Sequence, residues 1–374
     1  MGNKKKKRKG RRSQNGKRFG ELSALSKVAL VELLVVLLMA GMVVAFFLTR
    51  TEEKRDIIEA ISEERQELPD TEKESEQEPE AEQKIVYEPP SYDFTVEEVV
   101  VEIEGLQREY TLAWVSDLHM ITDKEAGDVD VAQLYDVKKR YDDLPVTQEG
   151  IHAEELWPEI VKFLNYQEFD GIIFGGDMID YCSTSNIEVL KEGYDSLRAP
   201  VLYVRADHDY GSWYGSYTLN DVKAHSLQAS IDGDDIEKKY LEFDDFIVIG
   251  VDNSNKNMPS GQMWMLEELY NKRKPVIAVT HVPYESEVDD SLEKLSFQVR
   301  NKVYYWGGGD YIPNEYTEEY LHMIYREETC VEQVLAGHLH ASWDGMMTEQ
   351  VPEHIFGPAF DGHIGVIHVI PEKQ

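Results

Sequence analysis

Six short runs of apolar residues, each ending on an aspartate or a histidine or within two residues of one, constrain how this chain of 374 residues can fold. Between them, residues 153–167 and 263–274 space their apolar side chains along one face of a helix, although Pro158 interrupts the first stretch. Alternation of strand and helix needs crossover connections, so it predicts an α/β domain with a largely parallel core sheet. The six predicted strands are residues 110–117, 171–177, 201–207, 246–252, 276–281 and 331–338.

Two further apolar runs, residues 354–360 and 363–370, follow with no helical stretch between them. We expect both to be strands through which the chain closes a second sheet. In sheets with crossover helices, ligands bind outside the carboxyl ends of the parallel strands. Because all six earlier runs end on or near Asp or His, we expect these side chains to gather at one edge.

The first 50 residues differ in charge from the rest of the chain. They hold 12 Lys or Arg and two acidic residues, whereas the remainder holds 26 basic and 70 acidic residues. Residues 28–49 contain one charge, Glu32, and approach the roughly 20 apolar residues that span a bilayer. Lys and Arg gather on the cytoplasmic side of such a span. We therefore predict a basic cytoplasmic tail at 1–27, an uncleaved transmembrane signal anchor at 28–49 and an extracytoplasmic remainder.

Residues 50–84 are rich in Glu and Gln and hold few apolar side chains. Such a segment cannot bury enough surface to fold, so we predict an acidic, largely disordered stalk, with a solvated helix in its first half as the alternative. Residues 85–374 then form the domain that carries the chemistry. The strong negative charge of this domain argues against nucleic acid held by a basic surface.

Cys182 and Cys330 are the only cysteines. Cys182 lies near the carboxyl edge of the predicted sheet, whereas Cys330 enters the strand that ends at His338. The two should be roughly one strand length, about 17 Å, apart. A disulfide needs a much shorter Cα separation, so we predict two free thiols.

The strand ends carry five short motifs, "SDLH", "GGDMID", "ADHD", "THVP" and "GHLH", which begin at residues 116, 175, 206, 280 and 337. Any one of them alone has an ordinary explanation, such as a turn, a helix N-cap or a hydrogen-bonded surface histidine. In "DLH" and "HLH", the spacing of two puts both side chains on one face if the backbone is extended. Carboxylates and imidazoles without thiolates suit Mn, Fe or Zn, and enough ligands are present for two ions.

The order of these motifs resembles the calcineurin-like metallophosphoesterase superfamily, whose motifs run D-x-H, G-D, G-N-H-D/E, H and G-H-x-H. The resemblance covers about residues 110–370. It implies a β-sandwich core flanked by helices in α/β/β/α layers, and a site with two divalent or trivalent metal ions. Two such ions can bind a phosphoryl oxygen, generate a hydroxide at neutral pH and stabilise an in-line displacement.

The resemblance also implies a role for each motif residue. Asp177 would bridge the two ions, and His208 would assist departure of the leaving group as an acid or hydrogen-bond donor. Asp180 would orient His208, whereas Asp209 is expected to be structural. The first ion would be held by Asp117, His119 and His340, and the second by Asp207, His281 and His338.

Position 207 departs from the family pattern, because Ala206, Asp207 and His208 stand where Gly-Asn-His is usual. A carboxylate adds negative charge beside the second ion, which should bind that ion more tightly and reduce its Lewis acidity. Two functions therefore stay open. The first is hydrolysis of a phosphomonoester or phosphodiester outside the cytoplasm by a metal-activated hydroxide. The alternative is a catalytically weak or inactive metal-binding scaffold or receptor domain.

Two long segments near the motifs, residues 120–150 and 304–313, are either substrate-contacting loops or solvated surface excursions. The identity of the phosphate ester, the metals and the oligomeric state do not follow from the sequence, because this phosphoryl chemistry is shared across a fold whose loops vary.

Overall fold

The computed structural model describes residues 87–122, 134–144, 146–212, 215–216, 222–233, 239–252, 260–307, 311–312, 315–326 and 328–373. All of them belong to one compact unit, Lys84–Gln374. The predicted tail, membrane anchor and stalk, residues 1–84, lie outside the described residues. Within the described part of the chain, no helix is long and apolar enough to cross a membrane.

The first of two large sheets has five strands in the order β1-β13-β2-β3-β4. Strands β2, β3 and β4 are parallel to one another, whereas β13 runs antiparallel to β2 and parallel to the edge strand β1. The strands span Thr95–Ile103 (β1), Tyr110–Val115 (β2), Gly171–Phe174 (β3), Val201–Tyr203 (β4) and His363–Pro371 (β13).

The second sheet has six strands in the order β11-β12-β10-β9-β8-β7. Its four inner strands are parallel, and the two edge strands run antiparallel to their neighbours. The strands span Lys239–Glu242 (β7), Ile247–Val251 (β8), Val276–Thr280 (β9), Val331–Ala336 (β10), Trp343–Met346 (β11) and Pro352–Ile355 (β12). A short hairpin, β5 (Gly211–Ser212) with β6 (Gly215–Ser216), is separate from both sheets.

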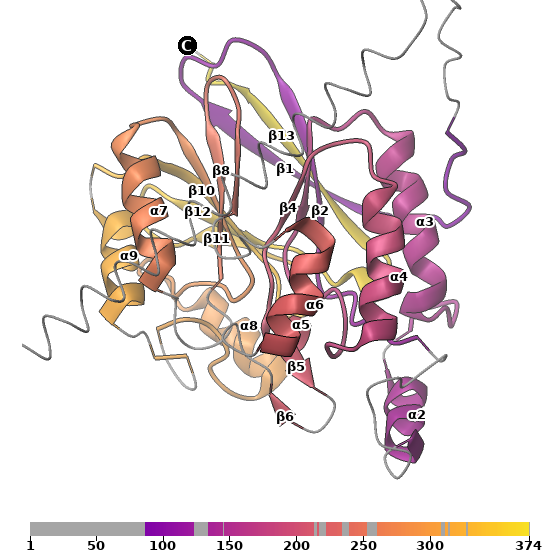
Figure 1. Cartoon of the computed structure of the whole chain (residues 1–374). Coiled ribbons are helices and arrows are strands. Elements are labelled where there is room, and N and C mark those ends of the chain that lie inside the picture. Colours follow the sequence, from indigo (N-terminus) through magenta and orange to yellow (C-terminus); the bar gives the residue numbers. More distant parts are fainter. Residues whose placement is uncertain are drawn as a thin grey trace, which may run out of the picture. The chain divides into compact units, whose positions relative to one another are not determined.

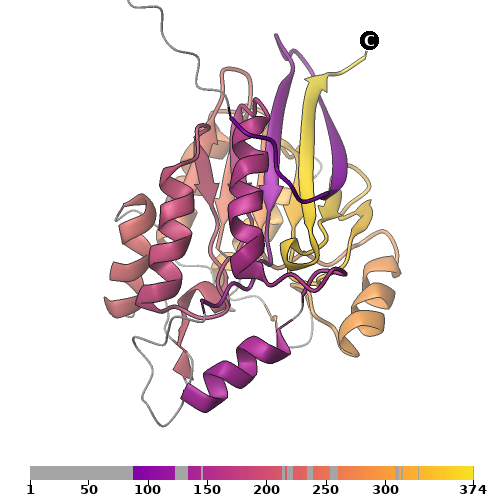
Figure 2. The same ribbon diagram turned by 90° about the vertical axis from the view of Figure 1, so that its right-hand side faces the viewer.

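Helices cover the outer faces of both sheets, as Figures 1 and 2 show. Side chains of α3 and α4 pack with the outer face of the first sheet, and side chains of α7 and α9 pack with the second. A third apolar cluster lies between the sheets, where the Trp114 and Phe356 rings stack at 4.9 Å. The helices are α2 (Leu134–Asp143), α3 (Ala153–Tyr166), α4 (Thr184–Asp195), α5 (Asp207–Tyr210), α6 (Val222–Asp232), α7 (Ser260–Asn271), α8 (Ser291–Arg300) and α9 (Glu315–Tyr325).

All six predicted strands are present and divide equally between the two sheets, so the two-sheet core flanked by helices that the resemblance implied is confirmed, whereas the single parallel core sheet that the alternation alone indicated is not. The C-terminal runs also differ from expectation. The first contributes only the end of β12 to the second sheet, and the other, β13, returns to the first sheet beside β2. A short 3-10 helix, η2 (Ala359–Asp361), directs this return, because the N–H groups of Ala359 and Phe360 bond the carbonyls of Ser116 and Asp117 just after β2.

Helix α3 runs unbroken through Pro158, so the interruption expected there does not occur. A proline inside a helix removes one backbone hydrogen bond. Burial of Trp157, Ile160 and Leu164 against the sheet offsets that loss.

The two cysteines are free, as predicted. Cys182 is buried beyond the end of β3, and Cys330 lies just before β10 in the other sheet.

Candidate metal centre

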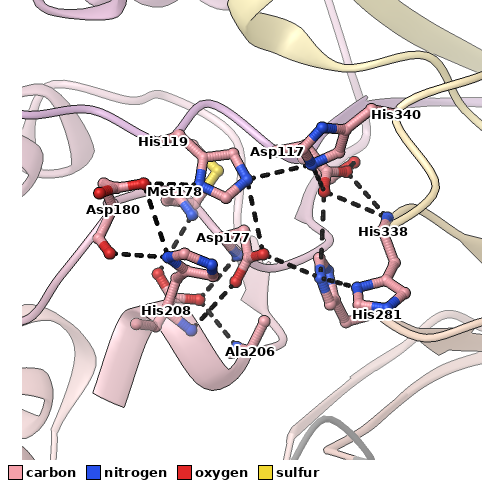
Figure 3. A network of polar contacts seen from close by, with 12 residues as sticks. Asp117, His119, Asp177, Met178, Asp180, Ala206, His208, His281, His338 and His340 are labelled. Carbon is pink, nitrogen blue, oxygen red and sulfur yellow. Dashed lines mark hydrogen bonds and ion pairs between the residues drawn. The ribbon is translucent and has the colours of Figure 1, made fainter. Parts of the chain in front are cut away.

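The five motifs come together where β2, β3, β4, β9 and β10 end (Figure 3). Six of the seven predicted metal ligands fall into two groups of three whose nitrogen and oxygen atoms lie within 4.8 Å of one another, and a further group of this kind joins His119 and Asp177 to His208. The first group is Asp117, His119 and His340, and the second is Asp177, His281 and His338. The fold thus gathers residues as far apart in the chain as Asp117 and His340.

In the first group, His119 Nε2 lies 3.1 Å from His340 Nε2. His340 Nε2 also lies 3.4 Å from Asp117 Oδ1. Two imidazole nitrogens and one carboxylate oxygen therefore converge on one point.

The second group repeats this arrangement around Asp177. His281 Nε2 lies 3.1 Å from Asp177 Oδ2 and 3.2 Å from His338 Nδ1. Asp177 Oδ2 also lies 3.6 Å from His119 Nε2 in the first group. Asp177 therefore faces both groups, which is the position of a carboxylate shared between two ions.

Hydrogen bonds to the outer ring nitrogens prepare two of these imidazoles for metal binding. His281 Nδ1 lies 2.8 Å from the carbonyl oxygen of Gly175, and His119 Nδ1 lies 3.2 Å from Asp180 Oδ1. Each Nδ1 donates its hydrogen there, so each Nε2 is the atom that would give its lone pair to a metal ion in place of a proton. This donor set, imidazole nitrogen with carboxylate oxygen, fits Mn, Fe or Zn.

The charges of the cluster also fit cations. Burial alone would raise the pKa of Asp117 and of Asp177, but the nearby His281 and other histidines hold both pKa values below the ordinary range. The two buried carboxylates are therefore ionised. Burial of paired negative charge of this kind needs positive charge close by.

The backbone at the cluster differs from the extended form that the spacing argument assumed, so that assumption was wrong. Five predicted ligands have left-handed φ angles between 48° and 71°, a region that Asp and His enter more readily than most residues. Backbone strain of this kind clusters at functional sites. The five are Asp117, His119, Asp177, His338 and His340.

Glycines let the motif loops approach one another closely. A Cβ at Gly337 would lie 2.5 Å from Asp117 Oδ2, and one at Gly176 would lie 2.7 Å from His281 Nδ1. Any side chain at either position would displace a predicted ligand.

Asp209 has the structural place that the motif suggested. It is fully buried, and its carboxylate accepts the N–H groups of Asp177 at 2.9 Å, Met178 at 3.1 Å and Ala206 at 2.8 Å. The hydroxyl of Tyr203 donates to it at 2.8 Å. Asp209 therefore ties the "ADHD" turn to the "GGDMID" turn.

We expected the carboxylate of Asp180 to orient His208, but the structure shows a different contact. His208 Nδ1 lies 2.7 Å from the backbone carbonyl oxygen of Asp180, whereas the nearest carboxylate oxygen is 3.6 Å away. The carboxylate lies closer to His119, as described above, and accepts two hydrogen bonds from Arg140, one of 2.8 Å. Asp180 thus orients His208 through its main chain and His119 through its side chain.

His208 faces the cluster at the start of α5, with its ring centre 4.6 Å from that of His119 and its side chain 36% exposed. Burial would lower the pKa of His208, but the charges of Asp177, Asp180 and Asp207 outweigh it and raise the pKa to about 9. The protonated, hydrogen-donating form is therefore favoured.

Asp207 is placed less directly than the other predicted ligands. It lines the pocket over the cluster but belongs to neither group of three. Its assignment as a ligand of the second ion stays a prediction.

A pocket of about 310 Å³ opens onto the cluster. Besides cluster residues, α2 lines it with Arg140 and Asp143, and the end of α8 with the loop that follows lines it with Arg300 and Tyr304. Motif reasoning missed these arginines because no motif contains them. Arg140 does lie in the long segment 120–150, and Tyr304 begins the segment 304–313, so those two segments contribute to the pocket wall.

One sequence family matches the region that carries the motifs. The calcineurin-like phosphoesterase family matches residues 110–342. No curated protein matches the sequence significantly. Similar solved structures include a dimetal phosphatase from Danio rerio, 12% identical, covering 67% of this chain and 88% of that chain with a TM-score of 0.40. Another is the cold-active protein-tyrosine phosphatase of a psychrophilic Shewanella species, 13% identical, covering 64% and 67% with a TM-score of 0.21.

Proposed function

Because this chain belongs to the calcineurin-like phosphoesterase family, we propose that it hydrolyses a phosphate ester at a centre of two metal ions. The observation that carries the proposal is the pair of imidazole groups that share Asp177. His119 and His340 stand on one side of it, and His281 and His338 on the other (Figure 3). The stability of the fold alone does not explain two groups of imidazole nitrogens that converge in this way.

Within this proposal, each side chain has a distinct task. When bound, two such ions neutralise phosphoryl oxygens and lower the pKa of water enough to make it a nucleophile. Asp177 would hold both ions, and Asp207 would add a carboxylate at the second. The remaining ligands are Asp117, His119 and His340 for one ion, and His281 and His338 for the other.

His208 acts on the leaving group. Its Nδ1–H donates to the carbonyl of Asp180, which leaves Nε2 as the atom that can give a proton or a hydrogen bond to the departing oxygen. The ring is held by its neighbours yet partly open to the pocket. Both properties suit a group that must meet a substrate in one orientation.

The experiment that tests this function compares the full-length protein, purified in a mild detergent, with its Asp177→Asn variant. We expect wild-type protein to bind two Mn²⁺ or Zn²⁺ ions per chain and to hydrolyse p-nitrophenyl phosphate until a chelator is added. The variant should lose metal and activity together. Hydrolysis that survives complete removal of metal would contradict the proposal.

A second candidate function is a metal-binding scaffold without turnover. Asp207 favours it, because a carboxylate at this position adds negative charge where the family usually has an amide. Stoichiometric metal with no hydrolysis of either a monoester or a diester would favour the scaffold.

We also propose that the domain acts outside the cytoplasm, anchored by residues 28–49. The basic residues before that apolar segment and the acidic chain after it support this orientation. Protease added to intact cells should digest the domain. Digestion only after lysis would contradict this orientation.

A further inference from the structure

Arg300 is a cation without an anionic partner at the edge of the pocket. None of the described residues forms an ion pair with it, although the whole chain carries a formal net charge of −34. Its Nε is buried and has no hydrogen-bond partner among the described residues. A buried donor left without a hydrogen-bond acceptor destabilises the fold, so its presence needs an explanation.

The position of Arg300 is tied to a predicted metal ligand. Its Nη2 donates to the backbone carbonyl of His338 at 3.0 Å. Its guanidinium carbon lies 5.3 Å from the centre of the Tyr304 ring, which stacks on the His338 ring at 4.1 Å. The guanidinium is therefore held beside the second metal group and does not simply cap its own helix.

The other arginine that lines the pocket, Arg140, already has a carboxylate partner. Arg140 gives its Nε and one Nη to the carboxylate of Asp180. A guanidinium has five N–H donors in a planar fork that matches phosphate oxygens. Only Arg300 combines a place in the pocket wall with an unpaired charge among the described arginines that line the pocket.

Arg300 and His208 both line the pocket over the metal cluster. Figure 3 shows His208 and Asp180 on one side of Asp177, and His281 and His338, whose carbonyl Arg300 contacts, on the other. A leaving group that departs beside His208 leaves the ester-free oxygens of the phosphoryl group within the same pocket, where Arg300 is the unpaired cation. A diester would have to place its second, uncharged substituent there.

We propose that Arg300 binds a non-bridging phosphoryl oxygen and thereby makes dianionic phosphomonoesters the preferred substrate class over monoanionic phosphodiesters. This inference rests on the proposed function, since it assigns the substrate of the same site. The guanidinium stabilises the second negative charge that only a monoester carries.

The test compares p-nitrophenyl phosphate with bis-p-nitrophenyl phosphate, which share a leaving group, in full-length wild-type protein and Arg300→Gln. With equal metal content, kcat/KM for the monoester should fall roughly 10- to 100-fold, and that for the diester by no more than about threefold. Lys294→Gln removes the same charge from the solvent face of α8, where it pairs with Asp290, and serves as the matched control. Arg300→Lys should restore part of the monoester activity.

A second readout does not depend on turnover. Calorimetric titration of inorganic phosphate into the Mn²⁺-loaded protein should give a Kd at least about tenfold weaker in Arg300→Gln than in wild type or Lys294→Gln. If wild-type protein hydrolyses neither ester, the proposed function fails, and this titration still decides the role of Arg300. Equal loss of both ester activities, or unchanged phosphate affinity, would overturn the inference.

Discussion

Arg140 reaches from α2 to the carboxylate of Asp180 and donates two hydrogen bonds to it, one of 2.8 Å, across 40 residues of sequence. Asp180 in turn lies 3.2 Å from the Nδ1 of His119. Burial opposes ionisation of Asp180, but Arg140 and His119 hold its pKa below the ordinary range. Helix α2, in the long segment 120–150, therefore holds the predicted metal ligand His119 in place through Asp180.

Replacing Arg140 with Leu should weaken metal binding at the first group roughly 10- to 100-fold, because partners behind a metal-binding histidine set its orientation and basicity. Titration of the metal-free protein with Mn²⁺ measures this. Lys138→Leu is the control, since Lys138 lies on the same helix with its side chain 74% exposed. Equal effects of the two variants would contradict a positioning role for Arg140.

Asp209→Asn should destabilise the domain by about 2–4 kcal/mol, because an amide cannot accept all the hydrogen bonds that the buried carboxylate receives. Tyr203→Phe removes only the hydroxyl donor and should cost about 1 kcal/mol. Urea unfolding followed by circular dichroism compares them. A loss for Asp209→Asn no larger than that for Tyr203→Phe would argue against Asp209 as the tie between the two turns.

Acid should weaken an ion pair between the first strand and the last. Glu97 on β1 lies 2.5 Å from His363 at the start of β13. Burial would raise the pKa of Glu97, but His354, whose Nε2 lies 3.5 Å away, and the hydrogen bonds from His363 and Ser342 outweigh it and lower the pKa from 4.5 to about 2. Glu97 thus stabilises the fold above pH 4.5, and this contribution, about 3 kcal/mol, is lost as the pH falls from 4.5 towards 2.

The partner acts in the opposite sense. The hydrogen bond that His363 donates to the Glu97 carboxylate raises the pKa of His363 above 6.5, so its contribution is complete below pH 6.5 and is lost as the pH rises through the folded-state value. Glu97→Gln should therefore lower the free energy of unfolding most near pH 5.5 and flatten its decline below pH 4.5. The exposed neighbour Glu98 provides the control, Glu98→Gln. A decline below pH 4.5 that is equally steep in wild type and Glu97→Gln would refute the assignment.

Asp207→Asn should restore the family pattern at the third motif. Because it removes one negative charge from the pocket, the second ion should bind less tightly, and turnover at saturating metal should rise. Steady-state hydrolysis over a range of Mn²⁺ concentrations separates these effects. Asp143→Asn, which changes another exposed carboxylate that lines the pocket, on α2, should leave metal affinity unchanged. Unaltered metal affinity in Asp207→Asn would place Asp207 outside the ligand set.

The strands and the motif cluster could be predicted because they depend on local patterns. Strands β8 and β9 are buried at every position, so they read as continuous apolar runs. Parallel strands of one sheet end at the same edge, which brings Asp117 and Asp177 together. His281 follows β9 in the second sheet, so it joins them only because the two sheets pack with these strand ends side by side. The position of β13 in the sheet could not be predicted in the same way. Its return to β2 depends on backbone hydrogen bonds between η2 and the loop after β2.

The rest of the site depends on tertiary contacts that leave no periodic signal. The left-handed backbone at His119 and His340 is set by packing of the loops against one another. Arg140 and Arg300 come from helices outside the motifs, and nothing in their local sequence distinguishes them from surface arginines. The length of segment 120–150 was the one available sign that Arg140 would matter.

The most direct test of the account is turnover of p-nitrophenyl phosphate by full-length wild-type protein and His208→Ala at matched metal content. We predict metal-dependent hydrolysis in the wild type and a loss of roughly 100- to 10,000-fold in the variant, the usual contribution of a positioned acid. An activated leaving group can reduce that loss, so phenyl phosphate should be measured beside it. Equal rates for both proteins on both esters would contradict the assignment of His208 and, with it, the proposed mechanism.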